Sequence, residues 1–268
     1  MSFGADSRDG QAGARSLSTF KAMPGVFLFP LTGGHCVRNG SMIWTLLKYL
    51  VKKKITVNFK DLSRTKPISS RLGCDRGTPI DRYYVEQFLG NRSPLIKGRV
   101  LEIGDSAYSR RFGGEYCSDF EVLHAKPGNS KATIVGDLTD ISTLPPNAMD
   151  CFICTQTFNF IYDVQKAVLG AHYLLKPGGV LLATVGGISQ ISRYDMDRWG
   201  DYWRFTTASL QRLFEPVFAG GIEVESFGNV SAACAFLQGL AVEDLPDKAV
   251  LDENDPDYQL LITIVARK

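Results

Sequence analysis

The sequence predicts an α/β fold in which a mostly parallel sheet carries helices on both faces. The chain has 268 residues, 44% of them hydrophobic and 22% charged, which is enough to bury an α/β core. From residue 99 onward, short apolar runs alternate with segments of helical periodicity, the pattern of strand–helix–strand units. The apolar run at 100–103 ends in Gly104, as a buried parallel strand does where it enters a ligand-binding loop.

The N-terminal quarter is expected to stand apart from this domain. Residues 1–20 are small and polar, which predicts a disordered tail. Residues 21–74 are expected to form a lid or an oligomerisation segment, the latter implying a homodimer. Apolar residues recur at helical spacing over 43–50 and lysines follow, which favours a packed amphipathic helix over one lying on a membrane surface.

The domain is expected to occupy residues 75–268. Its first helix is expected to begin at Thr78 as the cap, with Pro79 in the first turn and Gly90 as the stop. Further helical patterns lie at 163–174 and 207–214. The apolar runs expected to form strands are 99–103, 119–124, 132–136, 149–155, 179–185, 222–227 and 259–266.

Charge and composition exclude several classes of protein. The chain has 30 basic and 28 acidic residues, so it lacks the basic excess of a protein that tracks nucleic-acid phosphates. No apolar stretch reaches the roughly 20 residues of a membrane span, and no signal core opens the sequence, so a cytoplasmic protein is expected. Cys151 and Cys154 lie in a strand-like run, which favours buried thiols over a zinc or redox site.

The loop after the first strand does not suit a dinucleotide. Binding of a pyrophosphate calls for G-x-G-x-x-G, whereas the three positions here are Gly104, Ser106 and Ser109. The Lys-Ser/Thr pair of a P-loop is also missing, so a nicotinamide-dependent reductase and a nucleoside-triphosphate site are disfavoured. Glu102 would repel phosphate and suits a ligand with an ammonium group.

Four motifs in order resemble those of class I S-adenosylmethionine-dependent methyltransferases, over roughly residues 75–266. "LEIGDSAY" at 101–108 keeps one glycine of that family's first motif, and "VGDLTD" at 135–140 is similar to the motif after its third strand. "MDCFICTQTFNFIYD" at 149–163 and "LLKPGGVLLATV" resemble the fourth-strand motif and the turn and strand after it. The resemblance implies a seven-stranded Rossmann-like sheet with its last strand antiparallel, and S-adenosyl-L-methionine as cofactor.

The resemblance also implies a set of cofactor contacts. Asp137 would recognise the adenine amine, and His124 stands where the family usually has an acid for the ribose hydroxyls, so ribose binding and simple packing both stay open for His124. Arg76 would meet the methionine carboxylate and Tyr84 would line the pocket, with helix packing as the alternative for both. The cofactor-binding residues expected on this basis are Glu102, Gly104, Asp105, Ser106, His124, Asp137, Leu138, Gln156, Arg76 and Tyr84.

The segment 186–206, "GGISQISRYDMDRWGDYWRFT", is expected to bind the methyl acceptor. It follows the fifth strand and is dense in Arg, Asp, Tyr and Trp, and loops at strand ends carry function more often than packing. Aromatic faces beside carboxylates suit a sugar ring; the alternative is a salt-bridged cover in which Asp201 pairs with Arg204. The expected acceptor-binding residues are Arg193, Tyr194, Trp199, Tyr202, Trp203 and Arg204.

Transfer to a hydroxyl needs a group that removes its proton. Asp201 and Asp195 are the leading candidates, and His35 would serve if an N-terminal lid closed over the site. No metal is expected, and magnesium held by Asp195, Asp197 and Asp201 is the disfavoured alternative. His172 and Asp163 are interpreted as structural.

The combined pattern resembles stand-alone bacterial methyltransferases associated with glycosyltransferases. That resemblance implies O-methylation of a sugar hydroxyl on a glycan or a glycosylated metabolite. Methylation of another natural product or of a peptide carboxylate is the alternative, and a non-catalytic methyltransferase-like binding module is a further one.

Overall fold

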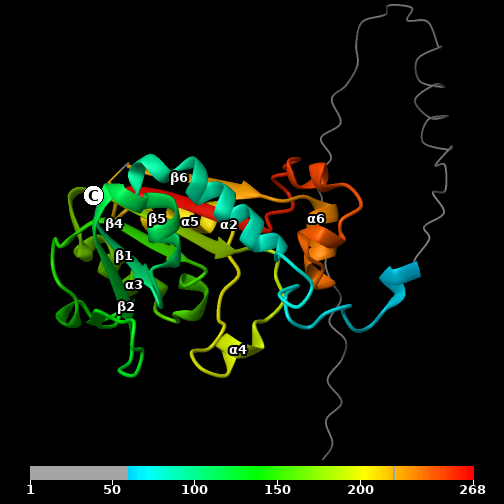
Figure 1. Cartoon of the computed structure of the whole chain (residues 1–268), viewed down its shortest axis with the longest axis horizontal. Helices are drawn as coiled ribbons and strands as arrows, with labels where there is room; N and C mark the ends of the chain where they lie inside the picture. The colour runs from blue at the N-terminus through cyan, green and yellow to red at the C-terminus, as the bar shows by residue number, and fades with distance from the viewer. Residues whose placement is uncertain (1–59, 220) are drawn as a thin grey trace, which may run out of the picture. The chain divides into compact units, whose positions relative to one another are not determined.

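A single seven-stranded sheet organises the chain, in the order β3-β2-β1-β4-β5-β7-β6 (Figure 1). The computed structural model describes residues 60–268 except 220, without the side chains of 61 and 62. The tail at 1–20, most of the 21–74 extension, the helix expected near 43–50 and His35 therefore lie outside the described residues.

The strands follow the predicted apolar runs closely. β7 pairs antiparallel with both β5 and β6, while the other neighbours pair parallel, which confirms the predicted antiparallel last strand. β5 begins earlier than expected because the LKPGG turn itself is part of the strand. The strands are β1 Gly98–Ile103, β2 Cys117–His124, β3 Ile134–Val135, β4 Met149–Thr155, β5 Leu175–Gly186, β6 Ile222–Phe227 and β7 Leu261–Arg267.

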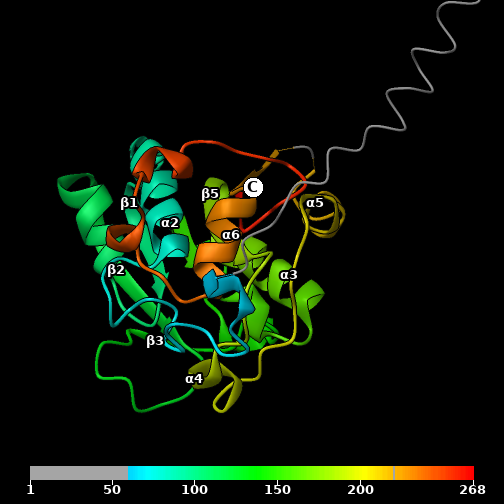
Figure 2. The same ribbon diagram turned by 90° about the vertical axis from the view of Figure 1, so that its right-hand side faces the viewer.

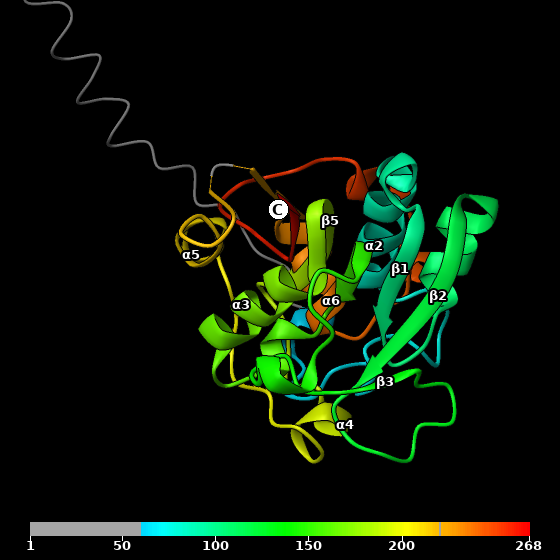
Figure 3. The ribbon, with the colours of Figure 1, turned by 90° about the vertical axis from the view of Figure 1, so that its left-hand side faces the viewer.

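Helices cover the two faces in pairs. α2 (Ile80–Asn91) and α6 (Val230–Leu237) contribute to one buried apolar cluster, and α3 (Val164–Leu174) and α5 (Thr207–Phe214) contribute to the other (Figure 3). The alternating side chains of β4 divide between the clusters, so Cys151 and Cys154 are buried on opposite faces, as free thiols. This burial raises the pKa of Cys154 to about 12 and confirms the interpretation of the pair as core residues.

The start of α2 differs from the prediction. Pro79 is the N-cap and makes no side-chain bond, and the helix continues past Gly90 to Asn91. Thr78 instead donates its backbone N–H and its hydroxyl to the carboxylate of Glu243, at 2.7 and 2.9 Å. Thr78 therefore fastens the entry of α2 to the C-terminal part of the chain.

The β2–β3 side of the sheet is thinly covered. The connection from β1 to β2 holds only the short turns Ser109–Gly113 and Gly114–Tyr116, and that from β2 to β3 holds no helix. The guanidinium of Arg110 lies 4.3 Å from the ring centre of Phe120, and a cavity of about 420 Å³ opens beside them.

A short helix, α4 (Arg193–Met196), stands off the sheet between β5 and α5. It lies below the arrowheads of β1 and β2 in Figure 3 and below the sheet in Figure 2. Within residues 60–268, the structure has no helix of the length and apolarity needed to cross a bilayer.

Candidate functional site

The strand order separates the carboxyl edge of the sheet into two halves. β1 pairs with β2 on one side and with β4 on the other, so the chain reverses direction across the sheet at β1 and β4. Ligands of open α/β sheets bind at such a switch point, beyond the carboxyl ends of the strands. The loops after β1, β2 and β3 form one half of this candidate site, and those after β4 and β5 form the other.

The loop after β1 turns at Gly104, whose φ of +79° lies in the left-handed region that favours glycine. Its shape depends on Glu102, which is 4% exposed and accepts the backbone N–H groups of Tyr108 at 3.1 Å and Ser109 at 2.8 Å. Burial raises the pKa of Glu102 and these two bonds oppose that rise. Each carboxylate oxygen thus accepts a backbone N–H of the chain's own loop.

The other expected contacts on this loop also have partners. Asp105 accepts the N–H of Ala107 at 3.0 Å and faces the ammonium of Lys131 at 3.5 Å. Ser106 accepts from the guanidinium of Arg110 at 3.0 Å. These bonds stiffen the turn that leads away from Gly104.

His124 and Asp137 lie together at the ends of β2 and β3. The N–H of Gly136 donates to the carbonyl of His124 at 3.1 Å, which sets Asp137 beside the end of β2. The His124 ring uses Nδ1 toward the backbone of Lys126, at 2.5 Å from its carbonyl oxygen. Asp137 uses one carboxylate oxygen to accept from Thr139. Among residues 60–268, Nε2 of His124 and the second oxygen of Asp137 have no hydrogen bond, so both can meet a ligand.

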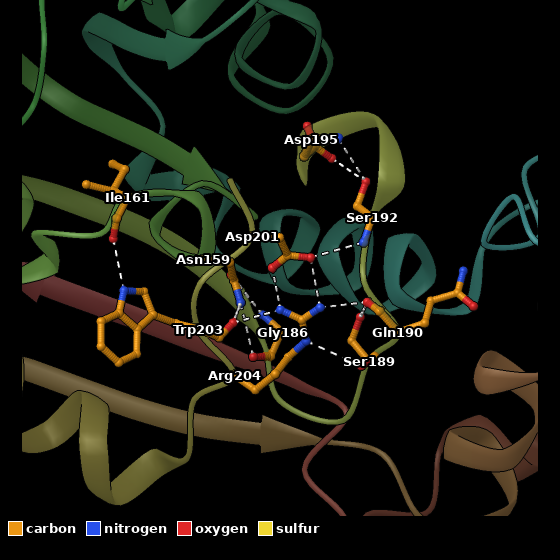
Figure 4. Close-up of polar contacts among 10 residues, drawn as sticks. All are labelled: Asn159, Ile161, Gly186, Ser189, Gln190, Ser192, Asp195, Asp201, Trp203 and Arg204. Atoms are coloured by element: carbon orange, nitrogen blue, oxygen red, sulfur yellow. Dashed lines mark hydrogen bonds and ion pairs between the residues drawn. The ribbon is translucent and has the colours of Figure 1, made fainter. Parts of the chain in front are cut away.

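Asn159 connects the loops after β4 and β5, a role that the sequence did not indicate (Figure 4). It is 3% exposed, accepts the N–H of Gly186 at 3.2 Å, and donates to the carbonyls of Gly186 and Trp203 at 3.3 and 2.8 Å. Its own carbonyl accepts the N–H groups of Tyr202 and Trp203 at 3.0 and 3.2 Å. The segment 186–206, called the acceptor loop below after its expected role, is therefore anchored on Asn159 through both its side-chain amide and its backbone carbonyl.

Gln156, at the end of β4, is held in an uncommon backbone conformation. Its φ is +47°, and its N–H donates to the carbonyl of Thr184 on β5 at 2.8 Å. Non-glycine residues in the left-handed region cost free energy and occur preferentially at functional sites. The conformation supports a role for Gln156 in this half of the site.

Asp201 is fixed in an ion pair, as Figure 4 shows. Its side chain is 1% exposed and accepts from Arg204 at 2.5 and 2.9 Å and from the N–H of Ser192 at 3.0 Å. This is the salt-bridged arrangement that was the alternative to catalysis. The carboxylate of Asp195 accepts only the hydroxyl of Ser192 among the described residues, at 2.5 Å, and the residue is half-buried, so it is the more available base.

Exposed aromatic side chains gather on the same half. Tyr162 is 71% exposed, Tyr202 50% and Trp203 37%. The ring of Tyr162 lies 5.4 Å from that of Tyr202 and 6.1 Å from that of Trp203, centre to centre, and the indole N–H of Trp203 donates to the carbonyl of Ile161 at 3.0 Å. Tyr162 belongs to the motif after β4, so the topology adds it to the two expected residues. Tyr194 stacks with Arg198, and Arg193 pairs with Asp197 on the exposed side of α4.

Three expected cofactor residues are placed differently. Tyr84 is fully buried against Phe227, and burial raises its pKa to about 12, which is the helix-packing arrangement given as the alternative. The guanidinium of Arg76 makes a bidentate ion pair with Asp244, at 2.7 Å for both bonds. The side chain of Leu138 is buried in the core.

The structural interpretations of two residues agree with the geometry. His172 packs edge-on against Phe218 with ring centres 5.1 Å apart, and Asp163 forms an ion pair with Lys166 at 2.7 Å instead of a capping bond. Among residues 60–268, no three His, Cys, Asp or Glu side chains gather as they would around a metal ion, and this includes Asp195, Asp197 and Asp201.

Residues 112–183 match a protein family described as a methyltransferase domain. The segment runs from the end of the first loop through most of β5; it includes Asp137 and Asn159 and leaves out Glu102 and Gly104. The chain is 27% identical over 143 residues to the human protein named mitochondrial arginine-hydroxylase NDUFAF5. That match covers 53% of this chain and only 35% of the relative's length.

Solved structures with a similar fold include three proteins of low sequence identity to this chain. A methyltransferase from Archaeoglobus fulgidus described as SAM-dependent has 12% identity and a TM-score of 0.46, covering 70% of this chain and 94% of that one. The [4+2]-cyclase SpnF has 18% identity and a TM-score of 0.47, covering 72% and 83%. A possible histamine N-methyltransferase from Thermotoga maritima has 15% identity and a TM-score of 0.46, covering 70% and 91%. The match to a methyltransferase domain falls within the sheet described above and runs from β2 through most of β5.

Proposed function

We propose that this protein transfers a methyl group from S-adenosylmethionine to a hydroxyl of a sugar-containing acceptor. The observation that carries the proposal is the division of the carboxyl edge into a half with free polar groups at His124 and Asp137 and a half with exposed aromatic rings. The bound cofactor supplies an activated methyl carbon. The half formed by β1, β2 and β3 holds the cofactor, and the half formed by β4 and β5 holds the acceptor.

The acceptor half suits a sugar ring. Tyr162, Tyr202 and Trp203 offer apolar faces that are anchored through Asn159 and Ile161, so little side-chain freedom is lost when a flat ring stacks on them. The resemblance to stand-alone methyltransferases associated with glycosyltransferases supports the same acceptor class. Asp195 is the proposed base, because Asp201 is neutralised by Arg204.

Calorimetry with S-adenosylmethionine and S-adenosylhomocysteine tests the cofactor half. Saturable binding of both is expected, and binding of a nicotinamide dinucleotide or ATP in their place would refute the proposal, while binding of none of these ligands would favour a non-catalytic module.

Methyl transfer from labelled S-adenosylmethionine to a panel of glycosides and peptides tests the acceptor half. For a hydroxyl acceptor, Asp195→Asn should lower kcat by about 10²-fold or more while keeping cofactor affinity. Undiminished turnover in Asp195→Asn would point to an acceptor that is already ionised, such as a carboxylate.

A further inference from the structure

Trp199 reaches across the carboxyl edge of the sheet from the acceptor loop. The loop leaves β5 at Gly186, yet the Trp199 ring lies edge-on to His124 at the end of β2, with ring centres 5.6 Å apart and planes at 78°. β4 and β1 separate β5 from β2 in the sheet. With neighbouring strands about 4.8 Å apart, the segment spans on the order of 14 Å and passes over the switch point.

The contacts that hold the indole are weak ones. The ammonium of Lys126 lies 4.9 Å from the centre of the indole, and the contact with His124 is an edge contact. Trp199 is half-buried and lies outside both apolar clusters of the core. Contacts of this kind can open and form again around a ligand.

The ends of β2 and β3 carry the polar groups of the cofactor half that have no hydrogen bond among residues 60–268. Nδ1 of His124 is committed to Lys126, which leaves Nε2 as the group that can meet a hydroxyl, and Asp137 stands on the adjacent strand end. An aromatic ring beside His124, with Asp137 on the adjacent strand end, matches a ligand that combines hydroxyls with a flat heterocycle, which is the chemistry of a nucleoside.

The neighbouring aromatic residues of the loop, Tyr202 and Trp203, belong to the other half of the site. Tyr202 and Trp203 are bonded through their N–H groups to Asn159 in the β4–β5 half, whereas Trp199 contacts the end of β2. Gly200 separates the two groups with a φ of +91°, and a Cβ there would overlap the Tyr202 ring. The chain direction thus changes at a glycine between Trp199 and the acceptor residues.

We propose that Trp199 is a cofactor-binding residue, closing over the adenosine part of bound S-adenosylmethionine and fastening the acceptor loop to the end of β2. The proposal rests on the proposed function, and it moves Trp199 from the expected acceptor contacts to the cofactor. Because one loop then carries residues for both ligands, cofactor binding orders the acceptor platform.

Calorimetry of S-adenosylhomocysteine with the full chain tests this assignment. Trp199→Ala should raise the dissociation constant about five-fold or more, in line with the loss of one base-stacking aromatic ring, and Trp199→Phe should recover part of it. The matched control is Trp203→Ala on the same loop, for which the dissociation constant should change less than two-fold. An unchanged constant in Trp199→Ala, or an equal loss in both alanine variants, would overturn the assignment.

Fluorescence provides a readout that does not depend on turnover. The chain has three tryptophans, so the double variant Trp44→Phe, Trp203→Phe leaves Trp199 as the reporter. Its emission should shift in a saturable way as S-adenosylhomocysteine is added, and a constant emission during calorimetrically verified binding would refute the proposal. If the wild-type chain binds neither form of the cofactor, the proposed function itself fails, which is a separate outcome.

Discussion

Among single residues, Glu102 illustrates how a buried carboxylate can shape a loop of the candidate site. Its oxygens accept the N–H groups of Tyr108 and Ser109, which orients the turn that begins at Gly104. The sequence indicated an acid of the right charge in the right place. It does not show which donors take up that charge, because those donors are backbone groups six and seven residues later.

Replacing Glu102 should loosen this loop. Glu102→Ala leaves the N–H of Ser109, which is fully buried, without its acceptor, at a cost of about 1–3 kcal/mol in the free energy of unfolding. Affinity for S-adenosylhomocysteine should fall in parallel, as calorimetry and urea denaturation would measure. Asp119→Ala, at an exposed position on β2, is the control and should change neither quantity.

Asn159 should control acceptor binding more than cofactor binding. Asn159→Ala removes the side-chain amide that bonds Gly186 and the carbonyl of Trp203, so the Tyr202–Trp203 segment loses part of its anchor and keeps its bonds to the backbone carbonyl of residue 159. Leaving the partners of this amide unpaired costs about 1–3 kcal/mol, so we expect the KM for the acceptor to rise about ten-fold or more. The affinity for the cofactor should change less than two-fold. An effect on cofactor affinity alone would contradict this positioning role.

At the scale of elements, α3 approaches the loop after β3 closely at a glycine. A Cβ at Gly170 would overlap the carbonyl oxygen of Leu138. Gly170→Ala should therefore lower the free energy of unfolding, although alanine is the better helix former. The matched control is Gly90→Ala in α2, where the nearest atom would be 3.7 Å away and a gain of up to about 1 kcal/mol is expected. Urea denaturation should show that the two substitutions change the free energy of unfolding in opposite directions. A change in the same direction would contradict the close approach at Gly170.

α3 also carries a pH-dependent contribution to stability. Burial, with the nearby charge of Lys268, lowers the pKa of His172. The unfolded chain therefore binds a proton at this residue below about pH 6.5, whereas the folded chain binds it only at a lower pH. Stability due to His172 is present above that pH and is lost as the pH falls through the folded-state pKa. In denaturation at pH 7.5 and 5.5, His172→Phe should lose less stability on acidification than the wild type does. Equal losses would contradict the assigned shift.

The elements that could be predicted are those with strong periodicity. The expected bounds of β4, β6 and α5 coincide with the observed ones, because β4 is a short apolar run, β6 alternates apolar and polar residues, and α5 is amphipathic. α6 was missed because "VSAACAFL" is small and apolar on every side. Within the site, the loop segments were located, but the partners of Asn159 and Asp201 depend on which strands become neighbours, and no local pattern contains that information.

At the scale of the whole molecule, the candidate site joins elements that are distant in sequence. Glu102, His124, Asn159 and Trp199 come from four separate segments, and the sheet order brings their strand ends to one edge. A ligand that binds across this edge contacts loops from both halves of the sheet. Its binding free energy should therefore add to the stability of the whole described domain.

Thermal unfolding of the full chain with S-adenosylhomocysteine tests this linkage. At 100 times its dissociation constant, a ligand that binds only the folded state contributes about 2.7 kcal/mol, which is roughly 5–10 °C in Tm for a domain of this size. Glu102→Ala should show a smaller shift at the same ligand concentration, because its looser loop binds more weakly. Asp119→Ala should match the wild type. If binding is confirmed by calorimetry but Tm does not move, the ligand also binds the unfolded chain or a part that unfolds independently, and the site does not join the elements as described.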